Sequence, residues 1–360
     1  MIIAVQIAED PANETILTLN PTSMKKLIIL LSIILPPSFL YGQGVIFLHH
    51  STGGNVYNQG DVAEYISNYN TQNGTDVQIT ERAYPNSPYP WNNYAYDYWN
   101  LWINSACDNA SSGIECLESI ASNYDIIIWK HCYPGAGIGD ASGEGDITSS
   151  SKTIPNYKLQ YRALRDKMDA LPDNDFIVWT LAPLHRLATS EEQAARAGEF
   201  VNWVKNDWLT EDGKTHPNIF IFDFFGIVAE QGASPAQGFQ YCLKYDFEGS
   251  HESSDSHPNT LANETAGPVF AQYIIDVALG NITEQYSSRL QEVMQAYPNP
   301  TSGELHITGL HPSSDIYIYN LLGKKVRTVH DADGQLDISF LDPGIYFLKS
   351  EGQVVRIVKE

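Results

Sequence analysis

Short runs of consecutive apolar residues, bounded by glycine, proline or polar residues, recur along most of the chain. Apolar runs of this length are typical of strands that are buried on both faces of a sheet. They predict strands at residues 45–48, 77–80, 124–129, 176–181 and 219–222. The stretches between them are mostly helical in pattern. This alternation predicts an α/β domain whose parallel five-stranded sheet carries helices on both faces.

Apolar residues at helical spacing define the helices that we expect between these strands. Helices are predicted at residues 61–69 and 156–171, and a third follows a capping box at 189–192. In the third helix four apolar residues share one face: Ala194, Ala197, Val201 and Val204. A last helix is predicted at 268–279, with Pro268 in its first turn.

A different pattern begins at a Pro/Gly cluster at residues 297–303 and continues to the end of the chain. Short strands are predicted there at residues 304–308, 315–319, 336–340, 345–349 and 353–358. Helical spacing is absent from this part of the sequence, so we expect a small all-β sandwich at 297–360. A charged linker at 283–296 separates it from the α/β domain at 43–282.

The N-terminal residues read as an export signal. Lys25 and Lys26 precede the apolar stretch 27–40, and Gly42 is a suitable cleavage position before Gln43. We therefore interpret residues 24–42 as a signal peptide and residues 1–23 as the product of a misassigned start. The apolar stretch is too short for a transmembrane anchor, so we expect a secreted or surface protein.

Composition narrows the range of partners and the state of the cysteines. The net charge of −22, from 43 acidic and 21 basic residues, argues against nucleic acid or an anionic membrane as a partner. The four cysteines are expected in an oxidising compartment, where three pairings are possible. We favour Cys107 with Cys116, because they would close a small loop, and then Cys132 with Cys242. A free thiol is the alternative.

Ser51 is the first candidate catalytic residue, because it comes directly after the apolar strand in the sequence VIFLHHSTGG. Ligands bind at the carboxyl ends of strands in open α/β sheets. The glycines after Ser51 leave backbone N–H groups accessible beside it, so this position suits a nucleophile with an oxyanion donor. The alternative is an ordinary polar turn.

Asp255 and His257 lie two residues apart in the stretch HESSDSHPN, just before the last predicted helix. In an extended segment such residues point to the same side, so Asp255 can orient the imidazole of His257. From this place a histidine can reach back over the edge of the sheet towards Ser51. A polar surface loop is the alternative interpretation.

An aromatic run, AYPNSPYPWNNYAYDYWNLWI, occupies residues 83–103. Aromatic faces beside amide side chains suit sugar rings, which stack through their C–H faces. Trp91, Tyr94 and Trp99 are therefore candidate substrate-binding residues, unless the rings of this run pack within the domain.

Together, the strand-end serine, the α/β pattern and the Asp–His pair resemble the SGNH/GDSL-type hydrolases, which are esterases and lipases. The stretch FLHHSTG resembles the first block of that family and places Ser51 on its nucleophile. DSHPN resembles the last block and places His257 on the base and Asp255 on its orienting residue. The resemblance covers residues 43–280 and implies a flavodoxin-like three-layer sandwich.

The chain departs from that family at its oxyanion residues. The first block usually reads Gly-Asp-Ser, whereas His49 and His50 precede the serine here. The family's third-block asparagine has no counterpart after YDIIIW, where Lys130-His131-Cys132 follow. Its second-block glycine is also not evident. The remaining candidates for oxyanion or substrate contact are Thr52, Gly53, Lys130 and His131.

The C-terminal stretches YPNPTSGELHI, IYNLLGKKV, LDPGIYFLK and VVRIVKE resemble the sorting domain of the type IX secretion system of Bacteroidota. This resemblance implies passage across the outer membrane by the secretion machinery, usually with removal of the tail. It also implies either release or attachment to the cell surface. An accessory sugar-binding sandwich is the alternative.

The leading hypothesis is an exported serine esterase that deacylates a carbohydrate or another ester and requires no metal or organic cofactor. A second hypothesis is a surface carbohydrate-binding or adhesion protein that has lost the chemistry on the same scaffold. A third is a metal-dependent hydrolase that uses His49, His50, Asp255 and His257.

Overall fold

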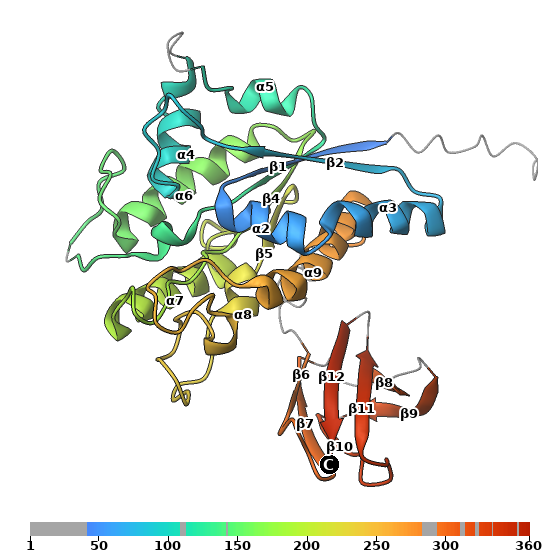
Figure 1. The fold of residues 1–360 in the computed structure, drawn as a ribbon. Helices are drawn as coiled ribbons and strands as arrows, with labels where there is room; N and C mark the ends of the chain where they lie inside the picture. Colours follow the sequence, from blue (N-terminus) through green and yellow to red (C-terminus); the bar gives the residue numbers. More distant parts are fainter. Residues whose placement is uncertain are drawn as a thin grey trace, which may run out of the picture. The chain divides into compact units, whose positions relative to one another are not determined.

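A five-stranded parallel sheet forms the centre of the α/β domain (Figure 1). Its strand order is β2-β1-β3-β4-β5, and every neighbouring pair is parallel. The strands are β1 (Gln43–His49), β2 (Val77–Ala83), β3 (Ile126–Trp129), β4 (Asp175–Trp179) and β5 (Ile219–Phe222). The predicted five-stranded parallel sheet is thereby confirmed, and β2 extends further than its apolar run indicated.

The computed structural model describes residues 42–108, 113–141, 143–282, 294–309, 314–320, 324–332, 334–350 and 353–360. Residues 24–41 of the expected signal peptide, the residues before it and most of the expected linker lie outside these ranges. Within the described ranges, no helix combines the length and the apolar character needed to cross a membrane.

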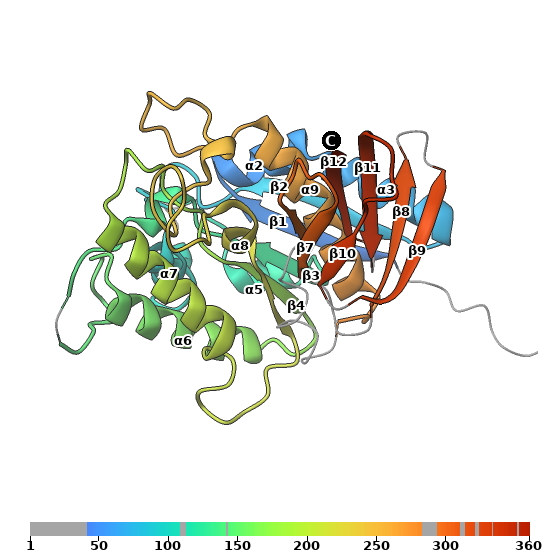
Figure 2. The same cartoon turned by 90° about the horizontal axis from the view of Figure 1, so that it is seen from below.

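Successive residues of the central strands enter two separate hydrophobic clusters, because side chains alternate across a sheet. One face is covered by α4 (Ala95–Trp102), α5 (Leu117–Ala121), α6 (Ile154–Asp169) and α7 (Glu191–Asn206). The other face is covered by α2 (Ser51–Gln59), α3 (Val62–Asn73), α8 (Phe224–Val228) and α9 (Thr260–Ala278). Figure 2 shows α6 and α7 side by side, where Tyr161 and Phe200 pack with ring centroids 5.0 Å apart.

The sequence signals placed the start of α7 correctly and the start of α9 incorrectly. Ser190 caps α7 by accepting a hydrogen bond from the backbone N–H of Gln193, and the predicted apolar face of α7 is buried. The predicted start of the last helix at Pro268 was wrong. Asn259 caps α9 by accepting from the N–H of Ala262 at 3.0 Å, and Pro268 lies inside the helix. The helix continues through the proline because its buried face packs along α2 and the sheet.

Helices α2 and α9 approach so closely that glycine is needed at their contact. A Cβ atom on Gly267 of α9 would lie 2.4 Å from the Cα of Gly60, which ends α2. A Cβ on Gly60 would lie 2.6 Å from the Cα of Gly267. These neighbours are backbone atoms and cannot rotate away, so the contact fixes α2 against α9.

Two of the four cysteines form the predicted Cys107–Cys116 disulfide. The predicted Cys132–Cys242 disulfide was wrong, because both thiols are free and buried in different surroundings. Cys132 Sγ contacts the hydroxyls at the start of α2, whereas Cys242 Sγ contacts the carbonyl of Leu243.

The C-terminal residues form two antiparallel sheets that share one hydrophobic cluster. One sheet contains β6 (Gln295–Tyr297), β7 (Glu304–Thr308) and β10 (Gln335–Asp337). The other contains β8 (Ser314–Asn320), β9 (Lys325–Ala332), β11 (Gly344–Ser350) and β12 (Gln353–Lys359). The expected small β structure is present. The sequence pattern missed β6, which begins within the expected linker, and β9.

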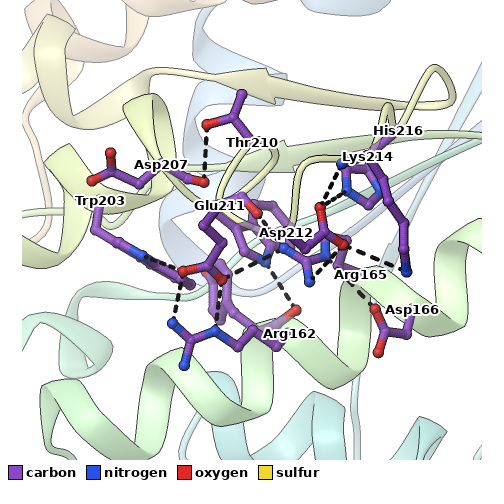
Figure 3. A network of polar contacts seen from close by, with 12 residues as sticks. Arg162, Arg165, Asp166, Trp203, Asp207, Thr210, Glu211, Asp212, Lys214 and His216 are labelled. Carbon is purple, nitrogen blue, oxygen red and sulfur yellow. Dashed lines mark hydrogen bonds and ion pairs between the residues drawn. The ribbon is translucent and has the colours of Figure 1, made fainter.

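A polar network joins the end of α7 to α6 (Figure 3). Arg162 donates two hydrogen bonds to the carboxylate of Glu211, at 2.6 and 2.7 Å. The buried Arg165 side chain lies 3.5 Å from the same carboxylate and 3.2 Å from that of Asp212. The hydrogen bonds from Arg162 are the main cause that lowers the pKa of Glu211.

Gly267→Ala is expected to destabilise the protein by about 1–3 kcal/mol, because the added methyl group overpacks a backbone contact. Alanine is intrinsically the better helix former, so a stabilised variant would show that α2 and α9 can separate without cost. The measurement is chemical denaturation of the full chain. Glu264→Ala, at an exposed position of the same helix, is the matched control.

Glu211→Gln is expected to lower the thermal denaturation midpoint at neutral pH. The folded state lowers the pKa of Glu211. The ionised carboxylate therefore stabilises the protein fully at pH values above 4.5, the ordinary pKa of a glutamate. This contribution is lost as the pH falls through the lowered value in the folded state. The difference between variant and wild type should therefore be constant above pH 4.5 and shrink below it, and a difference that persists in acid would contradict the assignment.

Candidate active site

Ser51 is the first residue of α2, directly after β1 and the extended His50. A Cβ on Gly53 would lie 2.5 Å from the Cβ of His49 and 2.9 Å from the Cδ of Lys130, so only glycine lets the helix start so close to the strand ends. The Ser51 side chain is exposed, and it lies at the N-terminal end of the helix dipole. The N–H of Gly53 already donates to the carbonyl of His50 at 2.7 Å.

The segment after β3 approaches the same helix start. Cys132 Sγ lies 3.3 Å from the Oγ of Ser51 and 3.2 Å from the Oγ1 of Thr52. Lys130 is fully buried, and its Nζ has no hydrogen-bond partner among the described residues. Because neighbouring side chains of an extended segment alternate, Lys130 and Cys132 lie on the α2 side of the sheet.

His131 faces the opposite side of the sheet. Its Nε2 is 2.7 Å from the hydroxyl of Tyr161, and its ring packs against Trp129 and Tyr98. Burial, with a further contribution from Lys130, lowers the pKa of His131 to about 3. The structure thus places the side chain of His131 in the hydrophobic core, away from the side of the sheet on which Lys130 and Cys132 lie.

Asp255 and His257 form the pair that their spacing predicts. The Nδ1 of His257 lies 2.7 Å from the Oδ1 of Asp255, and the backbone N–H of His257 donates to the same oxygen at 3.1 Å. Partial burial raises the pKa of Asp255, but these hydrogen bonds outweigh it and lower that pKa below its ordinary value. The side chain of His257 is 30% exposed and so is open to a substrate.

His257 lies close to the Ser51 region without contacting Ser51. Its ring packs edge to face on Tyr133, with ring centroids 4.8 Å apart, and Tyr133 is the residue after Cys132. Within the described part of the chain, no hydrogen bond joins Ser51 and His257; the Ser51 hydroxyl instead contacts Cys132. Hydrogen bonds of catalytic groups are often long before substrate binds, so this geometry leaves His257 as a candidate proton carrier.

A buried carboxylate anchors the segment that carries Asp255 and His257. Glu248 is fully buried and lies 3.1 Å from His185, 3.0 Å from Arg186 and 2.9 Å from His251. The backbone N–H of His185 also donates to the Oγ of Ser256, at 2.9 Å. Sequence reasoning missed this anchor, because its members come from separate segments and have no motif.

The aromatic run contributes one exposed ring to the site. Trp91 is 39% exposed and stacks on His50 at 3.6 Å between ring centroids. Tyr94 and Trp99, the other two expected substrate-binding rings, are buried in the domain. Trp91 therefore remains as the ring that can meet a substrate beside Ser51.

His49 and His50 point to different partners. His49 Nε2 lies 2.7 Å from a carboxylate oxygen of Glu81, and His50 Nε2 bonds to the carbonyl of Pro85. In the ranges that the structure describes, no group of three or more His, Cys, Asp or Glu side chains is placed to hold a metal ion. The proposed metal site of His49, His50, Asp255 and His257 is thus contradicted by the arrangement of these side chains.

One pocket lies away from Ser51, between residues 139–141 and 143–145 and helices α6 and α7. Basic and acidic side chains line it together: Lys158, Arg162, Arg196, Asp140, Glu144 and Glu199. None of the candidate catalytic residues lines this pocket. It therefore adds nothing to the Ser51 site.

Comparison with known proteins identifies the C-terminal part of the chain. Residues 295–360 match the family described as the secretion system C-terminal sorting domain. The chain is therefore exported, to the outer surface or into the medium, and its tail engages the type IX secretion machinery. No curated protein matches the chain.

Two solved structures are similar to the chain at low TM-scores. One is a gut microbial diltiazem-metabolizing enzyme, at 10% identity and a TM-score of 0.35, covering 85% of this chain and 74% of that one. The other is a double mutant of the Cellulomonas fimi endo-β-1,4-mannanase, at 11% identity and a TM-score of 0.22, covering 86% and 69%. Neither similarity assigns a role to Ser51.

Trp91→Ala is expected to raise the pKa of His50 from about 4 towards 6.5, because burial is the main cause that lowers it and Trp91 covers one face of its ring. The measurement is a titration of the histidine ring signals by nuclear magnetic resonance. Trp91→Phe keeps an aromatic cover and should retain the low value. An unchanged pKa in Trp91→Ala would show that other groups bury His50.

Proposed function

We propose that the α/β domain is an exported serine esterase of the SGNH type. The observation that carries this proposal is the position of Ser51, which is exposed at the N-terminus of α2 at the carboxyl edge of the sheet. The hydrogen-bonded pair of Asp255 and His257 lies near the same edge, because His257 packs on Tyr133. The strand order β2-β1-β3-β4-β5 is one of the two common doubly wound orders, and it supports a flavodoxin-like arrangement.

In the proposed reaction, Ser51 Oγ attacks the carbonyl carbon of an ester and forms an acyl-enzyme, which water then hydrolyses. Asp255 holds the imidazole of His257 in one tautomer, and His257 carries protons between the serine, the leaving alcohol and the attacking water. The N–H groups at the start of α2 and the buried charge of Lys130 favour the negative charge on the tetrahedral intermediate. These groups substitute for the missing oxyanion asparagine.

The proposed substrate is an acyl group on a carbohydrate. Trp91 supports this choice, because its exposed ring stacks on the residue before Ser51 and offers a flat face to a sugar ring. Export places the enzyme where it meets extracellular glycans.

A catalytically inactive carbohydrate-binding protein is the second candidate function. It is favoured by the contact of Ser51 with Cys132 in place of His257 and by the lack of an oxyanion asparagine. Such a protein would bind glycans through Trp91 and release no product.

Ser51→Ala is expected to lower kcat/KM about 10⁴-fold on p-nitrophenyl acetate and on acetylated xylan, because the nucleophile is lost. His257→Ala should also lower it, about 100-fold or more. Ser67→Ala, at an exposed position of α3, is the control and should match wild type. Glycan binding by a wild-type protein without hydrolysis would replace the esterase with the second candidate.

A further inference from the structure

The hydroxyl of Ser51 meets a sulfur atom in the resting structure. Cys132 Sγ lies 3.3 Å from Ser51 Oγ, and it also contacts Thr52 Oγ1 at 3.2 Å. The sulfur is thus surrounded by hydrogen-bond donors at the positive end of a helix dipole, which is an environment for an anion.

A second observation points to a negative charge at this place. Lys130 is fully buried and its ammonium group has no hydrogen-bond partner among the residues that the structure describes. An isolated buried cation is unfavourable unless an opposite charge compensates it. Burial lowers the pKa of Lys130, and the charge of Cys132 opposes that effect. Lys130 in turn lowers the pKa of Cys132 against the effect of its burial, so the thiol of Cys132 can supply the compensating charge.

We propose that Cys132 is a catalytic residue, present as a thiolate that is paired with the Lys130 ammonium and accepts the proton of Ser51 when Ser51 attacks the substrate. This inference rests on the proposed esterase function and changes one step of it, because Cys132 replaces His257 as the acceptor of the serine proton. It assigns the removal of the serine proton to Cys132 and leaves the leaving alcohol to His257.

The two free thiols of the chain differ in the way that this role requires. Although burial raises it, the pKa of Cys132 is lowered to about 7 by Lys130 and by hydrogen bonds from Ser51 and Thr52. Burial raises the pKa of Cys242, which has acidic neighbours in place of a lysine. A proton acceptor with a pKa near neutrality is well matched to catalysis at neutral pH.

Other titratable groups face the Lys130–Cys132 pair from the elements around it. His49, His50 and His131 interact with Lys130, and Tyr133 interacts with Cys132. Asp255 and His257, from the segment before α9, reach the pair only through Tyr133. Burial, with a contribution from Lys130, lowers the pKa values of His49 and His50, so both are neutral near pH 7. Lys130 is therefore the cation that sets the charge of Cys132.

The proposed cycle balances protons and charge. In acylation, Ser51 Oγ bonds to the carbonyl carbon and its proton passes to Cys132 Sγ, so the negative charge moves from sulfur to the carbonyl oxygen while Lys130 stays beside it. Protonated His257 then gives its proton to the departing alkoxide. In deacylation, His257 takes a proton from the attacking water, and Cys132 returns its proton to Ser51 Oγ as the acid leaves.

The first test measures the thiolate directly, without substrate. The full chain carrying Cys242→Ser has Cys132 as its one free thiol among the four cysteines, so ultraviolet absorbance reports its titration. We expect a midpoint near 7. Lys130→Met should raise that midpoint by about one unit or more. The methionine fills a similar volume and leaves no buried charge, so the variant is expected to fold.

The second test follows hydrolysis of p-nitrophenyl acetate by the full chain. Cys132→Ala is expected to lower kcat about 100-fold with a smaller change in KM, because a proton-transfer group is lost. The acid limb of the kcat/KM profile should lie near pH 7 and move upward in Lys130→Met by the same amount as the thiolate midpoint. Cys242→Ser is the matched control and should behave as wild type.

The outcomes separate this inference from the proposed function. Suppose that hydrolysis depends on Ser51, and that Cys132→Ala keeps both the activity and the acid limb of the kcat/KM profile. This result would overturn this inference alone and make His257 the acceptor of the serine proton. A thiolate midpoint that Lys130→Met leaves unchanged would do the same. Hydrolysis by the wild type that does not depend on Ser51 would overturn both.

Discussion

The close packing of the start of α2 on the ends of β1 and β3 determines the rest of the site. At Gly53 the helix leaves no room for a side chain between His49 and Lys130. This contact places the hydroxyl of Ser51 3.3 Å from Cys132 and covers the buried ammonium of Lys130. The second contact of α2, at Gly60 and Gly267, presses it against α9. A helix held at both ends in this way can present one serine at a fixed position, which nucleophilic chemistry requires.

A separate set of interactions holds the histidine. Asp255 and His257 lie in an irregular segment, and irregular segments are positioned by specific contacts because they lack a regular hydrogen-bond ladder. The buried Glu248 supplies these contacts through His185, Arg186 and His251. The serine and the histidine therefore depend on different parts of the fold: Ser51 contacts Cys132, and His257 packs on Tyr133, the next residue along the chain. The distance between the two groups is consequently the quantity on which the proposed chemistry most depends.

The C-terminal sheets serve a different purpose from the α/β domain. They have a hydrophobic cluster of their own, and their match to a sorting domain explains their presence without any role in catalysis. Export also gives a context for the two kinds of cysteine. Cys107 and Cys116 form a disulfide, whereas Cys132 forms none and its sulfur is buried against the hydroxyls at the start of α2.

Elements with local signals could be identified from the amino-acid pattern alone. Apolar runs identified the five strands, the spacing of Asp255 and His257 identified their hydrogen bond, and Ser190 identified the start of α7. Tertiary structure decided what depends on contacts between distant segments. The His131 side chain lies in the core, the Lys130 side chain lies on the α2 side of the sheet, and Tyr94 and Trp99 are buried. Cys132 and Cys242 lie apart, and α9 begins at Thr260, before Pro268. The physical reason is that periodicity records which residues are buried, whereas the partner of a buried group is fixed only when the whole chain packs.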